Sequence, residues 1–223
     1  MDLTVEERHE IVMKHAKKMC SIARLESRPI LKGALHKADG TIIATDSHRY
    51  IMAEQAHSFK EEKVISTVDG EILDGSYPDL TRLIPEGYEH RITLDVKKAI
   101  EAHKVIQSVT ALQDGGRAKK EAVAFLIIES VKNTSVKSVN ISGKSTVSEF
   151  EWFVGSPIDT SVQENGQNFK LAYKAEYMLQ ALQLFKDLGV DEVEIDMLTN
   201  TRLFLVHNYG AKIAVGILPV RIY

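Results

Sequence analysis

Apolar residues near the start of the chain recur at the spacing of an amphipathic helix. Val12, Ala16 and Met19 fall on one face of a helix predicted over residues 6–25. Pro29 favours the end of this helix, because the residue before a proline is pushed out of the helical backbone region. The first element is therefore predicted to be a helix with one buried face.

After Pro29 the pattern changes to short β-rich runs separated by turn residues. Strands are predicted at 30–36, 41–45, 50–53, 64–67 and 71–73. Asp-Gly pairs at 39–40 and 69–70 are strong hairpin signals. The segment is therefore predicted to form antiparallel strands.

The order of one helix followed by three strands then occurs twice more. The second unit is predicted as strand 92–94, helix 96–109 after the N-cap Asp95, and strands 123–131, 136–142 and 146–154, with a turn at Ser142-Gly143. The third is predicted as strand 169–173, helix 175–188 ended by Gly189, and strands 193–198, 202–207 and 212–217. This pattern predicts an α+β fold of three helix-plus-strands units, with helices on one face of antiparallel sheets.

Composition excludes several classes of protein. The chain is 44% apolar and 26% charged, which is typical of a folded globular protein, and its net charge of −3 excludes a uniformly basic surface but not one basic face. No apolar run reaches the ~20 residues that span a bilayer, and the acidic N-terminus lacks the features of a secretory signal. The single Cys20 cannot form an internal disulfide and is predicted to be a core residue. We therefore expect a cytoplasmic protein that does not associate with membranes.

Candidate catalytic and metal-binding residues give weak signals. Asp46, Ser47 and His48 are the residue types of a hydrolase triad, but neighbours on an extended chain point apart, so a polar turn is the favoured interpretation. The eight histidines show no metal-ligand spacing, and no glycine-rich phosphate loop is present. The sequence predicts no enzyme, no metal site and no cofactor; the alternative of an enzyme using these three residues would require activity that is lost in Ser47→Ala.

Two features suggest binding. Lysines and an arginine form stripes on the first two predicted helices, at Lys14, Lys17, Lys18 and Arg24 and at Lys97, Lys98 and Lys104. Such stripes fit either a solvated helix face or a polyanion-binding surface. The C-terminal run 217–223, which is apolar except for Arg221, fits either an edge strand or the lining of a pocket for a partner peptide.

Four blocks of sequence resemble the bacterial DNA polymerase III β subunit, the β sliding clamp family. They are RPILKGAL at 28–35, ATDSHRY at 44–50, GSYPDLTRLIP at 75–85 and GILPVRI at 216–222, in the order of the family. The family usually has Gly at the position of Ser47 and Phe at that of Tyr77. By this resemblance residues 1–90 are a truncated middle-type clamp domain and 91–223 a C-terminal-type clamp domain, while the N-terminal domain has no counterpart.

The resemblance implies a DNA-clamp fold and a sliding clamp or polymerase processivity factor. Its partners would be double-stranded DNA, bound without sequence specificity, the DNA polymerase and other proteins with clamp-binding peptides, and a clamp loader. The family forms a ring of twelve units, so three units in each chain would give a homo-tetrameric ring. The alternative is a clamp-like adaptor or decoy that forms no ring and binds the clamp-binding peptides of host replication proteins. A phage could encode such a protein.

The resemblance also implies site residues. The apolar peptide-binding pocket would comprise Leu31, Thr45, Ser47, His48, Arg49, Tyr50, Pro78, Arg82, Leu83, Ile217, Leu218, Pro219, Val220 and Arg221. The DNA-binding residues would be Lys14, Lys17, Lys18, Arg24, Arg28, Lys97, Lys98 and Lys104. The run QALQLF at 180–185 imitates a clamp-binding peptide, but Leu182 and Phe185 fit the buried face of the third helix.

Overall fold

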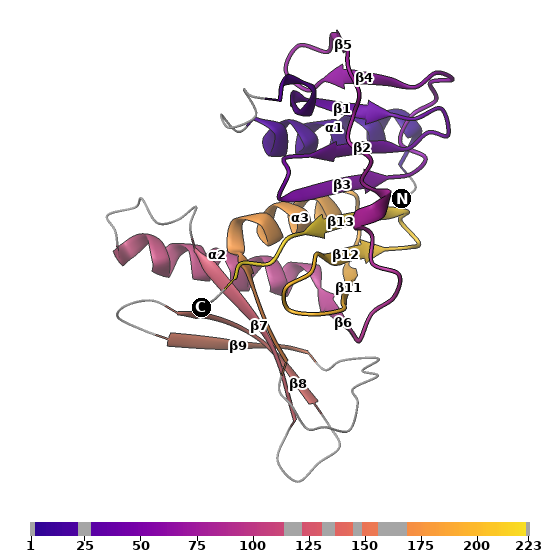
Figure 1. The fold of residues 1–223 in the computed structure, drawn as a ribbon. Coiled ribbons are helices and arrows are strands. Elements are labelled where there is room, and N and C mark those ends of the chain that lie inside the picture. The colour runs from indigo at the N-terminus through magenta and orange to yellow at the C-terminus, as the bar shows by residue number, and fades with distance from the viewer. Residues whose placement is uncertain are drawn as a thin grey trace.

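Three α-helices and two antiparallel sheets make up the part of the chain that the structure describes (Figure 1). The computed structural model describes residues 3–21, 28–113, 122–130, 137–144, 149–155 and 169–221. The helices are α1 (Val5–Cys20), α2 (Val96–Gln113) and α3 (Ala175–Asp187). None of the helices in these ranges is long and apolar enough to cross a membrane.

The larger sheet has nine strands in the order β5-β4-β1-β2-β3-β13-β12-β11-β6. Their bounds are β1 Gly33–His36, β2 Ile42–Thr45, β3 Arg49–Ala53, β4 Lys63–Ser66, β5 Ile72–Leu73, β6 His90–Asp95, β11 Glu192–Met197, β12 Phe204–Asn208 and β13 Ile213–Ile217. The four-stranded sheet has the order β10-β7-β8-β9, with β7 Val123–Ser130, β8 Lys137–Lys144, β9 Glu149–Gly155 and β10 Phe169–Lys174. The predicted fold class is confirmed.

Several predicted boundaries were wrong. The first helix ends at Cys20 and not at residue 25, with Ser21 as its C-cap. Pro29–Lys32 forms a single 3₁₀ turn, η2, which shortens the predicted strand 30–36 to β1. Ser142 and Gly143 lie within β8, paired with β7, because the strand continues past the turn that the Ser-Gly pair suggested.

The first and third units share one sheet, because β3 pairs with β13. Tyr50 lies opposite Gly216 and Arg49 opposite Ile217. Strands β1–β5 come from residues 1–90, β11–β13 come from 91–223, and β6 begins at His90, so the predicted domain boundary falls within a continuous sheet. The division into two domains stays a prediction.

One apolar core lies between the helices and the sheets. It includes Val12 and Cys20 of α1, and Leu182 and Phe185 of α3, all nearly or fully buried. The prediction that Leu182 and Phe185 are core residues is therefore confirmed, and so is the burial of Cys20. Burial raises the pKa of the Cys20 thiol to about 12, so the thiol stays protonated at neutral pH.

Polar contacts hold α1 in place. Thr4 and Glu7 form a capping box at its start. Arg8 donates through one guanidinium nitrogen to the carbonyls of Ala211 (2.6 Å) and Lys212 (3.0 Å), in the turn between β12 and β13. These contacts join the first helix to the last hairpin of the chain.

Candidate functional site

A second apolar cluster lies on the face of the nine-stranded sheet that points away from the helices. We call it the outer-face cluster; it consists of Ile43, Tyr50, Leu80, Leu203 and Leu205. Side chains alternate along a strand, so Ile43 points outward while its neighbours in β2 belong to the helix-side core. The cluster therefore spans strands from both ends of the chain.

Tyr50 reaches across the junction between the two parts of the sheet. Its ring lies over Gly216: a Cβ added to Gly216 would be 2.2 Å from Cε1 and 2.6 Å from Cζ of Tyr50. The ring thus runs from β3 across β13 toward Leu205, which pairs with Gly216 from β12. Tyr50 is 2% exposed, and its hydroxyl has no hydrogen-bond partner in the structure as described. Leaving a buried hydroxyl unpaired costs about 1–3 kcal/mol.

The segment 77–84 packs on the outer-face cluster. The Tyr77 hydroxyl accepts a hydrogen bond from the Thr45 backbone N–H (3.1 Å) and can donate to the Gly33 carbonyl (3.3 Å). Leu80 then joins the cluster and precedes the single 3₁₀ turn η3 (Thr81–Leu83), in which Leu83 is 50% exposed. A half-exposed leucine therefore lies next to a buried apolar cluster.

The loop between β2 and β3 is organised by Asp46. The Asp46 carboxylate accepts from the backbone N–H groups of His48 (2.9 Å) and Arg49 (3.1 Å) and from Arg49 Nε (3.0 Å). The His48 ring meets Asp46 at the backbone: His48 Nδ1 lies 3.4 Å from the Asp46 carbonyl oxygen. Asp46 is thus committed to shaping the loop, as the polar-turn interpretation predicted.

Ser47 has a φ of 73°, in the left-handed region that favours glycine. We expect Ser47→Gly to raise the free energy of unfolding by about 0.5–1 kcal/mol, because it removes backbone strain at an exposed position. Urea unfolding measures the change. Ser76→Gly is the control, since this exposed serine has no positive φ and its substitution should lower stability slightly. Equal effects at both positions would show that Ser47 is not strained.

The C-terminal segment continues past β13 beside this loop. The Leu218 N–H donates to the His48 carbonyl (2.9 Å), and the Val220 N–H donates to the Ala172 carbonyl of β10 (2.8 Å). Leu218 is 39% exposed. The segment therefore bridges the two sheets and leaves one leucine open to solvent.

The structure separates the predicted peptide-binding residues into three groups. Tyr50 belongs to the outer-face cluster, and Pro78, Arg82 and Leu83 belong to the segment that packs on it. The loop residues Ser47 and His48 and the terminal residues Leu218, Pro219, Val220 and Arg221 adjoin one another through the Leu218–His48 hydrogen bond. The third group, buried like Tyr50 but outside the outer-face cluster, consists of Leu31, Thr45, Arg49 and Ile217.

The residues of this third group support the loop and the sheet from within. Leu31 and Ile217 lie in the helix-side core, and the Thr45 hydroxyl donates to the Arg49 carbonyl. The Arg49 guanidinium stacks on the ring of Tyr177 in α3, 4.3 Å from its centroid. Sequence reasoning missed Ile43, Leu80, Leu203 and Leu205 as neighbours of Tyr50; alternation along the predicted strands was the signal available for Leu203 and Leu205.

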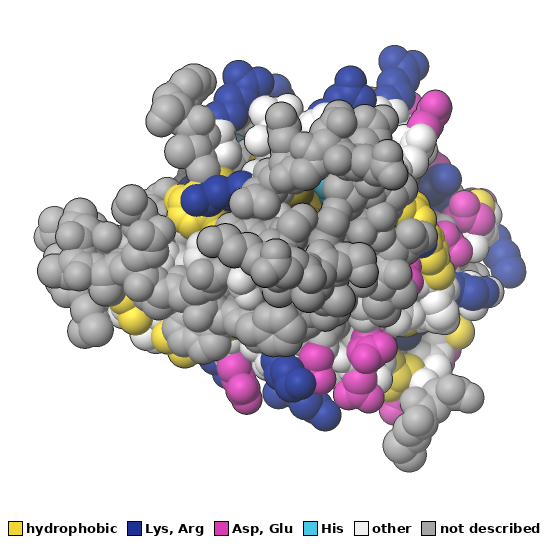
Figure 2. All heavy atoms as spheres, turned by 90° about the horizontal axis from the view of Figure 1, so that it is seen from below, with side chains coloured by type: hydrophobic (Ala, Val, Ile, Leu, Met, Phe, Trp, Pro, Cys, Tyr) yellow, Lys and Arg dark blue, Asp and Glu magenta, His cyan; other side chains and the backbone are white. Residues whose placement is uncertain are grey.

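The predicted DNA-binding lysines lie at exposed positions on α1 and α2, and α3 contacts both helices. Lys14 forms an ion pair with Asp187 of α3 (2.9 Å), and Lys97 forms one with Asp191 (3.4 Å). Lys17 and Lys18 lie in the last turn of α1. Arg28 is exposed, and Arg24 lies outside the described residues. In Figure 2, basic side chains predominate along the upper rim, while acidic and basic side chains lie side by side along the lower rim.

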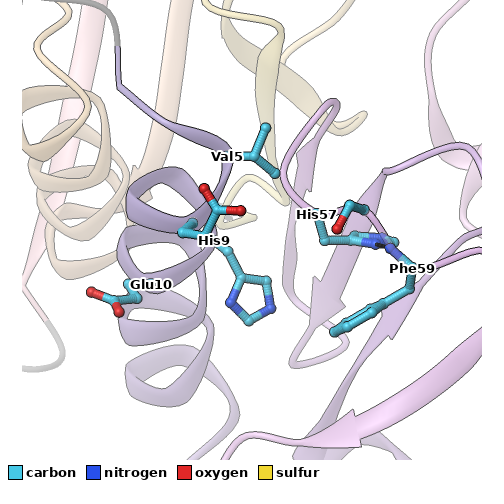
Figure 3. Close-up of a pocket in the computed structure, with 7 residues that line it drawn as sticks. Val5, His9, Glu10, His57 and Phe59 are labelled. Atoms are coloured by element: carbon cyan, nitrogen blue, oxygen red, sulfur yellow. Dashed lines mark hydrogen bonds between the residues drawn. The ribbon is translucent and has the colours of Figure 1, made fainter.

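A cavity of about 260 Å³ lies between α1 and the segment after β3 (Figure 3). His9 points toward Phe59 and His57, while Glu10 points away. The His36 Nδ1–H donates to the Ala34 carbonyl, so His36 Nε2 accepts from His9 Nε2–H at 3.2 Å. Both nitrogens of His57 contact backbone groups, and burial lowers the pKa of all three histidines. The histidines fix α1 to the sheet, and no group of three or more metal-ligating side chains occurs among the residues that the structure describes.

The sequence was compared with protein families and with individual characterised proteins. No family model matches the chain. The β sliding clamp of Staphylococcus aureus is 28% identical over 153 residues, which are 68% of this chain and 36% of that protein. The chain therefore spans about a third of the length of the curated relatives that it matches.

Solved structures of sliding clamps have a fold similar to that of this chain. The DNA polymerase sliding clamp of Bacillus subtilis superposes with a TM-score of 0.70 at 22% identity, covering 96% of this chain and 63% of that one. The β sliding clamp of Caulobacter crescentus gives a TM-score of 0.74 at 16% identity, covering 97% of this chain and 64% of that one. The resemblance indicated by the four sequence blocks is therefore confirmed: the chain has the fold of the bacterial β sliding clamp, the DNA polymerase III β subunit, and covers 63% and 64% of the two solved chains.

Proposed function

We propose that this protein is a sliding clamp that binds duplex DNA without sequence specificity and tethers a DNA polymerase, and other replication proteins, by a short peptide. It has no catalytic role in this proposal. The observation that carries it is the position of the outer-face cluster, at the β3–β13 junction between segments that resemble the clamp's middle and C-terminal domains.

The exposed leucines give this cluster the character of a peptide-binding site. Leu83 and Leu218 are 50% and 39% exposed and belong to segments that meet the cluster and the Asp46 loop. Burying one apolar anchor contributes roughly 1.5–3 kcal/mol, so a few such contacts give micromolar affinity. Such affinity suits partners that exchange, and tethering raises the local concentration of a polymerase at its template.

Replacing Leu218 and Pro219 with Ser should weaken binding of a clamp-type peptide about tenfold or more, because the exposed apolar contact is lost. Calorimetry with the synthetic hexapeptide Gln-Ala-Leu-Gln-Leu-Phe measures this. Val68→Ser is the matched control, since Val68 is 61% exposed on the β4–β5 hairpin, away from the cluster. Unchanged affinity in the double variant would count against the site.

The DNA surface is proposed to lie on the helix side, on Lys17 and Lys18 with the exposed lysines of α2 and Arg28. Lys17→Glu with Lys18→Glu should weaken duplex binding and reduce the slope of log affinity against log salt by about 2, because two phosphate contacts are lost. Lys60→Glu with Lys212→Glu makes the same change of charge at exposed positions elsewhere. Equal losses in the two pairs would show a general charge effect and no DNA surface.

The second candidate is the non-ring adaptor or decoy, which would use the same peptide site, at the outer-face cluster and the exposed Leu83 and Leu218, to bind the clamp-binding peptides of host replication proteins. The two candidates differ in assembly. A homo-tetramer, with three units in each chain and twelve in the ring, is expected of the clamp, with a clamp loader as a further partner. Mass measurement in solution decides: a closed oligomer supports the clamp, and a stable monomer that still binds the peptide supports the adaptor.

A further inference from the structure

Tyr50 lies in the outer-face cluster, which we propose binds peptides, and its buried hydroxyl has no hydrogen-bond partner among the described residues. Tyr50 is 2% exposed, and among the described residues no atom accepts or donates a hydrogen bond at its oxygen. Its cluster neighbours are the aliphatic side chains Ile43, Leu80, Leu203 and Leu205. A phenylalanine would fill the same space without leaving a polar atom unpaired.

The backbone fixes where this hydroxyl lies. Because Gly216 has no side chain, the Tyr50 ring crosses β13, and its distal edge lies over the Gly216 Cα. The hydroxyl therefore lies beyond Gly216, on the side of Leu205 in β12. Burial raises the pKa of the phenol, so the oxygen keeps its proton and is a hydrogen-bond donor at neutral pH.

The segment 77–84 packs on the outer-face cluster. Leu80 precedes η3, a single turn held by hydrogen bonds from Leu83 N–H to the Leu80 carbonyl (3.0 Å) and from Ile84 N–H to the Thr81 carbonyl (3.2 Å). Tyr77 fixes the start of this segment to β1 and β2. Leu80 is the cluster member that this segment contributes, so a peptide that reaches the hydroxyl has to displace Leu80 or one of its neighbours in the cluster.

We propose that Tyr50 is a specificity-determining residue, whose hydroxyl donates a hydrogen bond to an amide carbonyl of the bound peptide. The carbonyl comes from a glutamine side chain or from the peptide backbone; both are carboxamide acceptors. A site built this way rejects a purely apolar ligand, because that ligand leaves the hydroxyl unpaired. This inference rests on the proposed function, since it concerns the same site.

The test is a binding cycle measured by calorimetry. The protein is wild type or Tyr50→Phe, and the peptides are Gln-Ala-Leu-Gln-Leu-Phe and two versions with norleucine in place of one glutamine. Tyr50→Phe should weaken binding of the parent peptide about fivefold or more. If a glutamine is the acceptor, its norleucine version should be weakened for the wild type but show no further loss with Tyr50→Phe. If the backbone is the acceptor, Tyr50→Phe should weaken all three peptides equally.

Controls separate a binding role from a structural one. Tyr209→Phe removes a hydroxyl from a tyrosine that is 67% exposed and outside the cluster, and it should bind the peptides as the wild type does. Urea unfolding should show Tyr50→Phe to be as stable as the wild type or more so. Wild-type affinity in Tyr50→Phe would overturn this inference and leave the peptide site standing. If the wild type binds none of the peptides, the peptide-tethering part of the proposed function falls with it.

Discussion

Lowering the pH from 7 to 4 should destabilise the protein by several kcal/mol, because histidines are buried in their neutral form. His103 is fully buried; its Nδ1–H donates to the Ala99 carbonyl and its Nε2 accepts from the Tyr173 hydroxyl. Burial lowers the pKa of His103, and likewise that of His36, to about 4 from an ordinary 6.5. Between these values the unfolded chain binds protons that the folded chain does not. Stability is therefore fully present above pH 6.5 and is lost as the pH falls toward 4, by about 1.4 kcal/mol for each unit of pKa difference.

Urea unfolding at pH 7, 6, 5 and 4.5 measures this slope, and His103→Gln should flatten it by removing one titrating group. Tyr173→Phe is the matched control. It removes the hydroxyl partner but keeps the imidazole, so it should lower stability at every pH and retain the slope. A His103→Gln protein with the wild-type slope would show that His103 does not contribute to the acid sensitivity.

Gly216→Ala should lower the free energy of unfolding by about 2–3 kcal/mol, because the new methyl group overlaps the Tyr50 ring. The added Cβ would lie 2.2 Å from Cε1 of Tyr50, well inside van der Waals contact. The ring cannot move without disturbing Leu80, Leu203 or Leu205, which surround it. Urea unfolding measures the loss.

A double-mutant cycle identifies the cause of that loss. Tyr50→Leu shortens the side chain so that it no longer crosses β13, and Gly216→Ala should then cost much less in the Tyr50→Leu background. Gly210→Ala is the control, since the nearest atom to its added Cβ is the Asn208 side-chain oxygen at 3.3 Å. If Gly216→Ala is equally costly with and without Tyr50, the close approach of the ring does not explain the effect.

The periodic parts of the chain were predictable because their causes are local. Apolar spacing placed the first helix, and the cap residues Asp95 and Gly189 marked the start of the second and the end of the third. The Asp-Gly pairs placed the β1–β2 and β4–β5 hairpins, with Gly40 and Gly70 at positive φ as such turns require. Boundaries were less predictable. The Ser142-Gly143 pair has turn-forming residues, but pairing with β7 holds both within β8.

The candidate site was predictable only in part, because its members come from distant segments. The motif blocks pointed to Tyr50, Leu83 and Leu218. The structure places Tyr50 in the outer-face cluster, Leu83 in the turn that follows Leu80, and Leu218 next to the Asp46 loop. The blocks gave no sign that Leu31 and Ile217 face the helix-side core. They also gave no sign that Leu203 and Leu205 would neighbour Tyr50, since those residues lie outside every block.

The amino-acid sequence by itself determined the three helix-plus-strands units, the α+β class and the likeness to β sliding clamps, because these follow from periodicity and from short runs of residues. Only the tertiary structure decided that β3 pairs with β13. That pairing joins strands more than 150 residues apart and puts the Tyr50 ring over Gly216, leaving its hydroxyl without a partner in the described residues. Such contacts depend on chain packing in three dimensions, and no local pattern of side chains encodes them.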